Sequence, residues 1–272
     1  MVYKSVNFKA SDSVDISDRG LAFGDGIFTT AKIVDGDIEH IDDHIHRLRS
    51  GVLKLGLAQP DFNQIKAEMV KAAAGQLLAT LKVIISAGNS KRGYSRDGIE
   101  QPNVIVTCSP YPKHYLGWHS SGLTLGVSKT QLGRNPSLAG IKHLNRLEQV
   151  MIRQELDQLP VDEVVVCDYE HCIVECNSAN IFWRKNNIWY TPNLSMAGVN
   201  GIIRQKLMTL LPNVVECHAR ISELDSADII LLCNCLMAIA PVKNYNGRTL
   251  HIDHEYIDSL QQQLKDFDKC GE

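Results

Sequence analysis

LGRNPSLAGIKHLNRLEQV, residues 132–150, is the segment from which the fold and function of this chain are inferred. Lys142 lies in it between apolar Ile141 and Leu144, which indicates partial burial. Desolvation lowers the pKa of a lysine, and the neutral amine is the form that makes imines. The pattern alone does not single out Lys142, because most lysines are solvated surface charges.

The sequence after this segment predicts a mixture of helices and strands. A helix is expected over 144–158, where Leu144, Leu147 and Met151 share one face. Further helices are expected over 201–211 and 253–266. Strands are expected over 123–129, 162–168, 175–185, 214–220 and 228–242, with a turn at 168–171.

The sequence before the segment is also mixed. Strands are expected over 27–34, 81–88 and 103–109, and Asp35-Gly36-Asp37 supplies a hairpin turn that leads into a return strand. A helix over 42–57 would begin at Asp42 or Asp43 and end at Gly56, with Ile45, Leu48, Val52 and Leu55 on its apolar face. A second helix over 61–78 would begin at Asp61.

The order of these elements predicts an α+β fold with mixed sheets and flanking helices, because strands and helices do not alternate one for one. Residues 109–121 contain two prolines and no clear period. We therefore expect two domains, a smaller one over 1–114 and a larger one over 115–272 that carries Lys142.

The composition is that of an ordinary globular protein, with 272 residues, 44% apolar and 22% charged residues, and a formal net charge of −3. A chain so close to neutral has no bulk attraction for nucleic acid or for an anionic membrane. The N-terminal MVYKSVNFKAS has no apolar core of a secretory signal, and no apolar run reaches membrane-spanning length. A cytoplasmic protein is the expectation.

Metal and hydrolase chemistry find no support in the sequence. His44 and His46 are two positions apart and do not share a helical face, and no GxSxG motif occurs. The eight cysteines are irregularly spaced without a Cys-x-x-Cys pair, which favours reduced, buried thiols over a zinc site or disulfides. They are Cys108, Cys167, Cys172, Cys176, Cys217, Cys233, Cys235 and Cys270.

Three local features are compatible with a bound anion or cofactor, although each is weak alone. Gly198 and Gly201 precede a predicted helix, whose free N–H groups and dipole favour a phosphate. Arg47 lies at the edge of an apolar helix face, and a guanidinium can grip phosphate with two hydrogen bonds. Glu175 lies at a strand boundary, where it could bind a cation or be an ordinary surface acid.

Five segments resemble the aminodeoxychorismate lyases, a family of fold-type IV pyridoxal-phosphate enzymes that are related to the D-amino-acid and branched-chain aminotransferases. They are FGDGIFTT (23–30), HIHRLR (44–49), the segment 132–150, ECNSANIFWRK (175–185) and AGVNGIIRQ (197–205). The resemblance extends from the first predicted strand to about residue 242. It implies the two-domain fold-type IV architecture, with pyridoxal phosphate between the domains and a homodimer.

The resemblance also implies roles for individual residues. The cofactor would be held by Lys142 as a Schiff base, by Glu175 at the ring nitrogen, by Arg47 and the N–H groups of Ile202 and Ile203 at the phosphate, and by Ser178 and Asn177 along its side. Lys142 would then also move protons, and Thr30 would donate a proton to the leaving group. Arg92, Tyr94 and Asn234 would bind the substrate, although a loop arginine, a loop tyrosine and a strand-end amide remain the alternatives.

The implied activity is that of an oxo-acid lyase, which converts 4-amino-4-deoxychorismate into 4-aminobenzoate and pyruvate on the way to folate. A fold-type IV aminotransferase acting on amino acids is the alternative, because both reactions begin with the same proton loss. A non-catalytic protein that only carries the cofactor is a third possibility. It is disfavoured because Lys142, Glu175 and Arg47 are all present.

Overall fold

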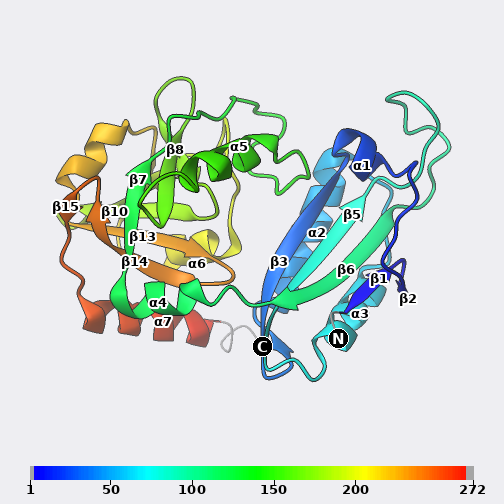
Figure 1. The fold of residues 1–272 in the computed structure, drawn as a ribbon, viewed down its shortest axis with the longest axis horizontal. Helices are drawn as coiled ribbons and strands as arrows, with labels where there is room; N and C mark the ends of the chain where they lie inside the picture. Colours follow the sequence, from blue (N-terminus) through cyan, green and yellow to red (C-terminus); the bar gives the residue numbers. More distant parts are fainter. Residues whose placement is uncertain (1–2, 268–272) are drawn as a thin grey trace. The chain divides into compact units, whose positions relative to one another are not determined.

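A computed structural model of the chain describes residues 3–267. Its internal contacts divide the chain into two units, both visible in Figure 1. The first unit is the chain up to Pro112 together with Lys142–Asn145. The second unit is Lys113–Ile141 and the chain from Arg146 onward.

This division differs from the predicted domains at the boundary and in the placement of Lys142, and the second difference concerns function. The predicted boundary after residue 114 lies two residues beyond the break in the structure. The sequence also assigns Lys142 to the second domain, whereas its contacts group it with the first unit. The physical reason is strand pairing between residues 142–144 and the first unit, which is described below.

The first unit is built on a six-stranded antiparallel sheet in the order β2-β1-β6-β5-β3-β4, which helices cover on one face (Figure 1). Its strands are β1 (Lys4–Val6), β2 (Lys9–Ala10), β3 (Gly26–Val34), β4 (Asp37–Ile38), β5 (Leu78–Ser86) and β6 (Asn103–Pro110). Its helices are α1 (Arg19–Phe23), α2 (Ile41–Leu55) and α3 (Phe62–Ala73). Alternate residues of β3 are buried, and a Cβ on Gly51 of α2 would lie 2.8 Å from Ile27 Cδ1, so α2 packs tightly on this strand.

The ends of α2 and α3 can be compared with the helix caps that the sequence predicts. Asp61 accepts hydrogen bonds from two N–H groups of the first turn of α3, as predicted. The prediction that Asp42 or Asp43 caps α2 is wrong, because the helix begins at Ile41 and its N-cap residue is His40, whose side chain makes no capping hydrogen bond. Both aspartates lie inside the first turn, where they interact favourably with the helix dipole. Gly56 ends α2 in a left-handed conformation, as predicted.

The helix predicted to continue to residue 78 stops at Ala73. Gly75 has a φ of +75°, which lies in the left-handed region, and Leu78 already pairs with Val34 of β3. The pairing with β3 therefore overrides the helical pattern of the last residues.

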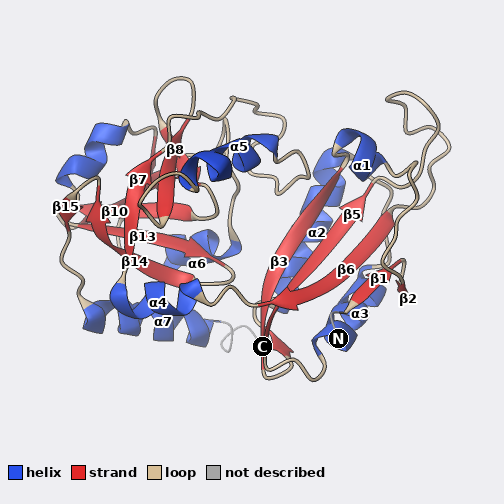
Figure 2. Cartoon of the chain, in the orientation of Figure 1, coloured by secondary structure: helices blue, strands red, loops and turns tan. Residues whose placement is uncertain are grey.

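The second unit contains a nine-stranded mixed sheet with flanking helices (Figure 2). Its order is β12-β11-β10-β13-β14-β7-β8-β9, with β15 against β14, and the pairs β11/β12, β14/β7 and β7/β8 are parallel. Its strands are β7 (Leu123–Val127), β8 (Glu163–Cys167), β9 (Ile173–Cys176), β10 (Asn180–Lys185), β11 (Ile188–Pro192), β12 (Val214–Cys217), β13 (Ile229–Asn234), β14 (Ala238–Tyr245) and β15 (Arg248–Thr249).

The helices of the second unit are α4 (His114–Ser121), α5 (Leu147–Leu156), α6 (Ile202–Leu210), α7 (His254–Phe267) and the short 3₁₀ helix η1 (Ile221–Ser226). One hydrophobic core joins α6 and α7 to the sheet through Phe182, Leu207, Leu231 and Leu260. This core fixes the N-terminus of α6 relative to the neighbouring strands.

The structure confirms the predicted α+β class with mixed sheets and corrects several details. Residues 114–121, predicted to be irregular, form α4, in which the rings of His114, Tyr115 and Trp118 contact one another. The strand predicted over 175–185 is broken by a turn after Cys176, and the run 228–242 folds back as the hairpin of β13 and β14. The sequence did not predict β1, β2, α1, β11 or η1.

All seven cysteines that the structure describes are free, and five of them are buried. Burial raises the pKa of Cys108, Cys167 and Cys217 to about 11, which keeps these thiols protonated at neutral pH. Cys270, which is also predicted to be a reduced, buried thiol, lies outside the described residues. Within residues 3–267, no helix is both long and apolar enough to cross a membrane.

Candidate active site

Lys142 is attached to β3 of the first unit by main-chain hydrogen bonds. Phe28 N–H donates to the Lys142 carbonyl (2.9 Å), and Leu144 N–H donates to the Gly26 carbonyl (2.9 Å). Residues 142–144 thus form a short antiparallel addition to the edge of β3 that β4 leaves open. The side chain of Lys142 is half-buried, as predicted, and its Nζ lies 4.6 Å from the centre of the Phe28 ring.

Thr30 lies on the same face of β3 as Phe28, because residues two apart in a strand point to the same side. Its neighbour Thr29 faces α2 instead, where its Oγ1 lies 2.6 Å from His44 Nδ1. Lys82 of β5 is paired in register with Thr30, and its Nζ lies 5.0 Å from the centre of the Phe28 ring. The first unit therefore gathers Lys142, Thr30 and Lys82 around one aromatic ring.

Arg47 lies on α2 in the same unit and is half-buried. Arg49, for which the sequence predicts a surface role, is exposed and stacks over the Phe62 ring at 4.4 Å. The difference in burial supports Arg47 as the better anion ligand of the two, because a partly desolvated charge interacts more strongly.

Glu175 is held by the segment that leads to α6 in the second unit. It lies in β9 with 6% of its surface exposed, and its Oε2 accepts a hydrogen bond from Val199 N–H (2.8 Å). Gly140 pairs with the main chain on either side of Val199, so the chain runs from this ladder to Lys142 in two residues. Burial lowers the pKa of the nearby Arg146, and the charge of Glu175 counters part of that effect.

The N-terminus of α6 has the features of an anion site. Gly201 is its N-cap residue, and no side chain caps the first turn. Ile202 and Ile203 bury their side chains in the core, so that this end presents main-chain N–H groups. A Cβ on Gly201 would lie 2.1 Å from Asn180 Oδ1, so a larger residue here requires the Asn180 side chain or the helix start to shift.

The turn between β9 and β10 carries Asn177 and Ser178. Ser178 donates to Glu163 Oε2 from its Oγ (2.6 Å) and from its N–H (3.2 Å). Among the described residues, the buried Oδ1 of Asn177 has no hydrogen-bond partner. A buried acceptor without a partner is costly, which is a reason to expect a ligand here.

Glu163 was not predicted, although it holds Ser178. Only 2% of its surface is exposed, and burial raises the pKa of its carboxyl against the hydrogen bonds from Ser178 and from neighbouring N–H groups. The available signal was an acid as the first residue of the apolar run EVVVC. Such an acid can as easily be a solvated strand end, so the sequence alone did not distinguish the two.

Asn234, a predicted substrate ligand, holds a turn. Its Oδ1 accepts hydrogen bonds from Leu236 N–H and Met237 N–H (2.9 Å each), which closes the hairpin after β13. Its Nδ2 donates to the Ser178 carbonyl (3.1 Å). Burial raises the pKa of Tyr115, and hydrogen bonding to Ser178 and Asn234 opposes this, so these three residues are neighbours in the second unit.

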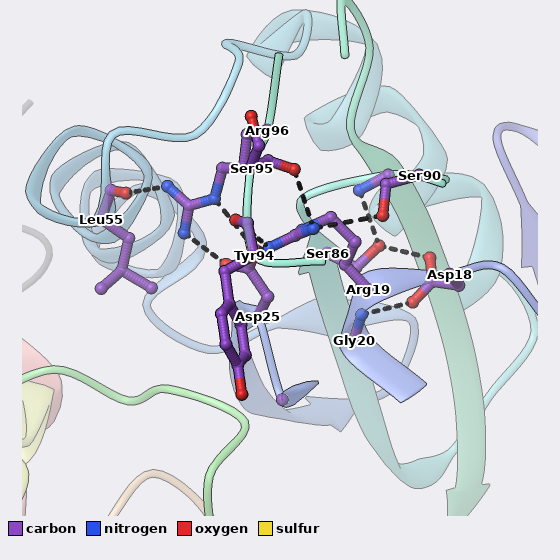
Figure 3. Close-up of polar contacts among 12 residues, drawn as sticks. Asp18, Arg19, Gly20, Asp25, Leu55, Ser86, Ser90, Tyr94, Ser95 and Arg96 are labelled. Carbon is purple, nitrogen blue, oxygen red and sulfur yellow. Dashed lines mark hydrogen bonds and ion pairs between the residues drawn. The ribbon is translucent and has the colours of Figure 1, made fainter. Parts of the chain in front are cut away.

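Arg92 and Tyr94 lie in the loop between β5 and β6 of the first unit, and both side chains are exposed. The Tyr94 side chain is 84% exposed, and its ring centre lies 5.4 Å from that of Phe23. Figure 3 shows that the main chain of this loop contacts the guanidinium of Arg19. The sequence did not predict Arg19, because its loop partners lie more than 70 residues away.

The described residues fit pyridoxal phosphate. Lys142 would supply an amine, the buried Glu175 would supply a carboxylate for a ring nitrogen, and the uncapped start of α6 would supply donors for a phosphate. The unpartnered Oδ1 of Asn177 adds an acceptor in the same unit as Glu175. The site residues fall into two groups, with Lys142, Thr30, Arg47, Arg92 and Tyr94 in the first unit and Glu175, Asn177, Ser178, Ile202, Ile203 and Asn234 in the second.

Comparison with known proteins identifies the family. A family model described as amino-transferase class IV matches residues 26–245, and the chain belongs to this family of pyridoxal-phosphate enzymes. The chain is 34% identical over 252 residues to the aminodeoxychorismate lyase of Vibrio harveyi, which covers 91% of this chain and 93% of the relative. It is 26% identical over 249 residues to the D-alanine aminotransferase of Bacillus licheniformis, which covers 88% and 85%.

A solved structure agrees with these relatives. The 4-amino-4-deoxychorismate lyase from Pseudomonas aeruginosa superimposes with a TM-score of 0.89 and 29% identity, over 97% of this chain and 98% of that chain. The expectations of a fold-type IV architecture and of pyridoxal phosphate as cofactor are thereby confirmed.

Proposed function

We propose that this chain is a lyase that converts 4-amino-4-deoxychorismate into 4-aminobenzoate and pyruvate. The observation that carries the proposal is its similarity to the Vibrio harveyi lyase over more than nine tenths of both chains. The D-alanine aminotransferase of Bacillus licheniformis is less similar and shares less of its length. The solved Pseudomonas aeruginosa lyase adds support over nearly the whole chain.

In the proposed reaction, the bound cofactor supplies an electron-withdrawing ring that weakens the C4–H bond of the substrate. Lys142 Nζ accepts the C4 proton, and the C3–O bond then breaks to release enolpyruvate. The carbocycle becomes aromatic, which drives the step. Enolpyruvate takes up one proton to become pyruvate, so the two products together contain all the atoms of the substrate.

Each proposed residue performs a task that its surroundings allow. Glu175 keeps a proton on the ring nitrogen, since it is a buried acid already fixed by Val199 N–H. Arg47 and the N–H groups of Ile202 and Ile203 bind the phosphate. Ser178 and Asn177 line the cofactor from the turn after β9.

The remaining residues act on the substrate. Thr30 presents its hydroxyl on the face of β3 that also carries Phe28 and the Lys142 amine, and it donates the proton to the leaving enolpyruvate. Arg92, Tyr94 and Asn234 hold the carboxylates of the substrate. Asn234 Oδ1 accepts the two turn N–H groups and one Nδ2 hydrogen goes to the Ser178 carbonyl, so its second Nδ2 hydrogen would donate to a substrate carboxylate.

Product analysis tests this proposal. The purified protein, supplied with pyridoxal phosphate and 4-amino-4-deoxychorismate, is expected to form 4-aminobenzoate and pyruvate in equal amounts. Lys142→Ala should form neither product. A protein that leaves this substrate unchanged but transfers amino groups between D-alanine and 2-oxoglutarate would instead be an aminotransferase, and the lyase proposal would be wrong.

Two further expectations remain predictions. We expect a homodimer, because fold-type IV enzymes typically form homodimers, and light scattering should then give twice the 30.3 kDa mass of the chain. We also expect the protein to act in the cytoplasm. Fractionation of cells that express it at natural levels tests this expectation.

A further inference from the structure

The loop between β5 and β6, residues 87–102, has an exposed tip around Gly93. Lys91, Arg92 and Tyr94 are all exposed, and nothing lies within 4 Å of a Cβ built on Gly93. Near the residues proposed to bind substrate, the ring of Tyr94 contacts the ring of Phe23 in α1. Residues 93–95 are held in addition by contacts to their main chain.

Arg19 of α1 supplies those contacts. Its Nη1 donates to the carbonyls of Gly93 and Ser95 (3.1 Å each), and its Nη2 donates to the Tyr94 carbonyl (2.9 Å). Nη1 also contacts Ser90 Oγ at 3.1 Å. Three successive carbonyls thus converge on one guanidinium, and Figure 3 labels two of these residues, Tyr94 and Ser95, beside Arg19.

Asp25 holds Arg19 and joins it to a second arginine. Arg19 Nε donates to Asp25 Oδ2 (2.7 Å), and Arg96 Nε donates to the same oxygen (2.9 Å). Arg96 Nη2 also donates to Asp25 Oδ1, and its Nη1 donates to the Leu55 carbonyl at the end of α2 (2.5 Å). Asp25 directly precedes Gly26 of β3, so the loop is connected to both β3 and α2.

Burying these charged groups costs desolvation free energy, so stability alone does not explain the arrangement. Only 3% of Arg19 is exposed, and the Asp25 side chain is 9% exposed. Well-packed apolar residues are often as stabilising as a buried ion pair. What a fork of donors provides and an apolar contact does not is a fixed orientation of the loop main chain.

We propose that Arg19, Asp25 and Arg96 form a loop clamp, which positions Arg92 and Tyr94 to bind the carboxylates of the substrate. This inference rests on the proposed function of the chain. The clamp residues are positioning residues, because Arg19 holds the main chain of residues 93–95 and Asp25 joins Arg19 to the Arg96 side chain.

Arg19→Lys is the decisive variant, because lysine keeps the charge next to Asp25 but cannot reach three carbonyls with a planar fork. We expect KM for 4-amino-4-deoxychorismate to rise about tenfold or more, with kcat within about twofold of wild type. The absorption band of the bound cofactor should not change. Arg96→Gln is a second variant at a more exposed position, and it should raise KM by a smaller factor.

The chain offers a matched control in its second unit. Arg248 Nη2 donates to the carbonyls of Leu224 and Ala227 (2.8 and 3.0 Å), so it too holds a main-chain segment. Arg248→Lys removes the same kind of fork away from the β5–β6 loop. Its KM should equal that of wild type.

Trypsin provides a readout that does not depend on activity. Lys91 and Arg92 are exposed, but cleavage requires the surrounding loop to unfold locally. Cleavage after these residues should be several times faster in Arg19→Lys than in wild type, and unchanged in Arg248→Lys. Far-UV circular dichroism verifies that each variant is folded.

The outcomes separate the clamp from the lyase activity. Folded Arg19→Lys with an unchanged KM overturns the clamp, whether or not trypsin cleaves faster. If wild type does not turn over the substrate, the proposed function fails. Unchanged trypsin cleavage in Arg19→Lys would then also reject the clamp, whereas faster cleavage would support its action on the loop.

Discussion

At the scale of residues, β3 carries two adjacent threonines with different roles, one proposed to act in catalysis and the other buried in the core. Thr30 shares a face with Phe28, whereas Thr29 is buried against His44 of α2. Because both are threonines in one strand, replacing each by valine changes the same atoms in two different surroundings. The pair is therefore a direct test of the role proposed for Thr30.

Thr30→Val is expected to lower kcat by about 100-fold, since a positioned proton donor contributes on this order. The cofactor band and the thermal midpoint should stay close to wild type. Thr29→Val should lower the free energy of unfolding by about 1–3 kcal/mol, because it leaves a buried histidine nitrogen without this partner. Steady-state kinetics and thermal melts of both variants measure this contrast, and loss of cofactor from Thr30→Val would contradict its assignment.

Local patterns predicted single residues well only where the partner is close in the chain. Asp61 was predicted as a cap because its acceptor role is completed within three residues. Arg19 and Glu163 escaped prediction because their partners lie far away in sequence, at Gly93 and Ser178. Lys142 was found through family resemblance, since its contact with Phe28 spans more than 100 residues.

At the scale of elements, the N-terminus of α6 carries a prediction about the cofactor. Gly201→Ala would place a Cβ 2.1 Å from Asn180 Oδ1, so either the buried Asn180 side chain or the first turn of α6 must shift. We expect the dissociation constant of pyridoxal phosphate to rise about tenfold, which corresponds to about 1.4 kcal/mol. Fluorescence or absorbance titration of the cofactor-free protein measures it.

Gly117→Ala in α4 is the matched control. A Cβ there has nothing within 4 Å, so the helix should gain about 0.5–1 kcal/mol of stability. Its affinity for the cofactor should be unchanged. Equal affinities for Gly201→Ala and Gly117→Ala would show that the start of α6 does not bind the phosphate.

Strong periodicity predicted the long elements, and strand pairing decided the others. Helix α2 was predicted because four apolar residues share one face, and β3 was predicted as a strand that the hairpin turn Asp35-Gly36-Asp37 follows. The predicted end of α3 was wrong because Leu78 pairs with Val34 of β3, and no local sequence pattern reveals this pairing. Short strands such as β1 exist only through their partner β6 and carry too few residues for a pattern.

At the scale of the whole molecule, Asp25 links the loop clamp to stability in acid. Burial alone would raise the pKa of this carboxyl, but the hydrogen bonds and charges of Arg96 and Arg19 outweigh burial and hold it below 3.8. As the pH falls, Asp25 therefore becomes protonated in the unfolded chain while it is still ionised in the folded chain. The free energy of unfolding consequently falls as the pH drops from 3.8 through the lower folded pKa.

Asp25→Asn should make this acid loss less steep, because the titrating group is gone. At pH 7 the variant should be less stable by about 3 kcal/mol, since Arg19 is left buried without its carboxylate. Urea denaturation at pH 7 and acid titrations followed by circular dichroism measure both effects. If the acid transition of the variant is as steep as that of wild type, Asp25 does not contribute to the loss of stability in acid.

The break between the two units after Pro112 falls within residues 109–121, where the sequence predicts an interdomain connection, but the sequence does not predict the grouping of Lys142 with the first unit. The segment 142–144 leaves the second unit to extend β3 of the first, and only the hydrogen bonds to Gly26 and Phe28 reveal it. This excursion explains why the lysine lies far in sequence from Thr30 and yet shares its strand face.

The most direct test of the account is to locate the lysine that binds the cofactor. The loaded protein is reduced with borohydride, digested and analysed by mass spectrometry, and its formation of 4-aminobenzoate is measured before and after reduction. We predict a phosphopyridoxyl group on the peptide that contains Lys142, together with loss of activity. A label on another lysine, such as Lys82 beside the same phenylalanine ring, or an unlabelled protein that retains activity, would contradict the account.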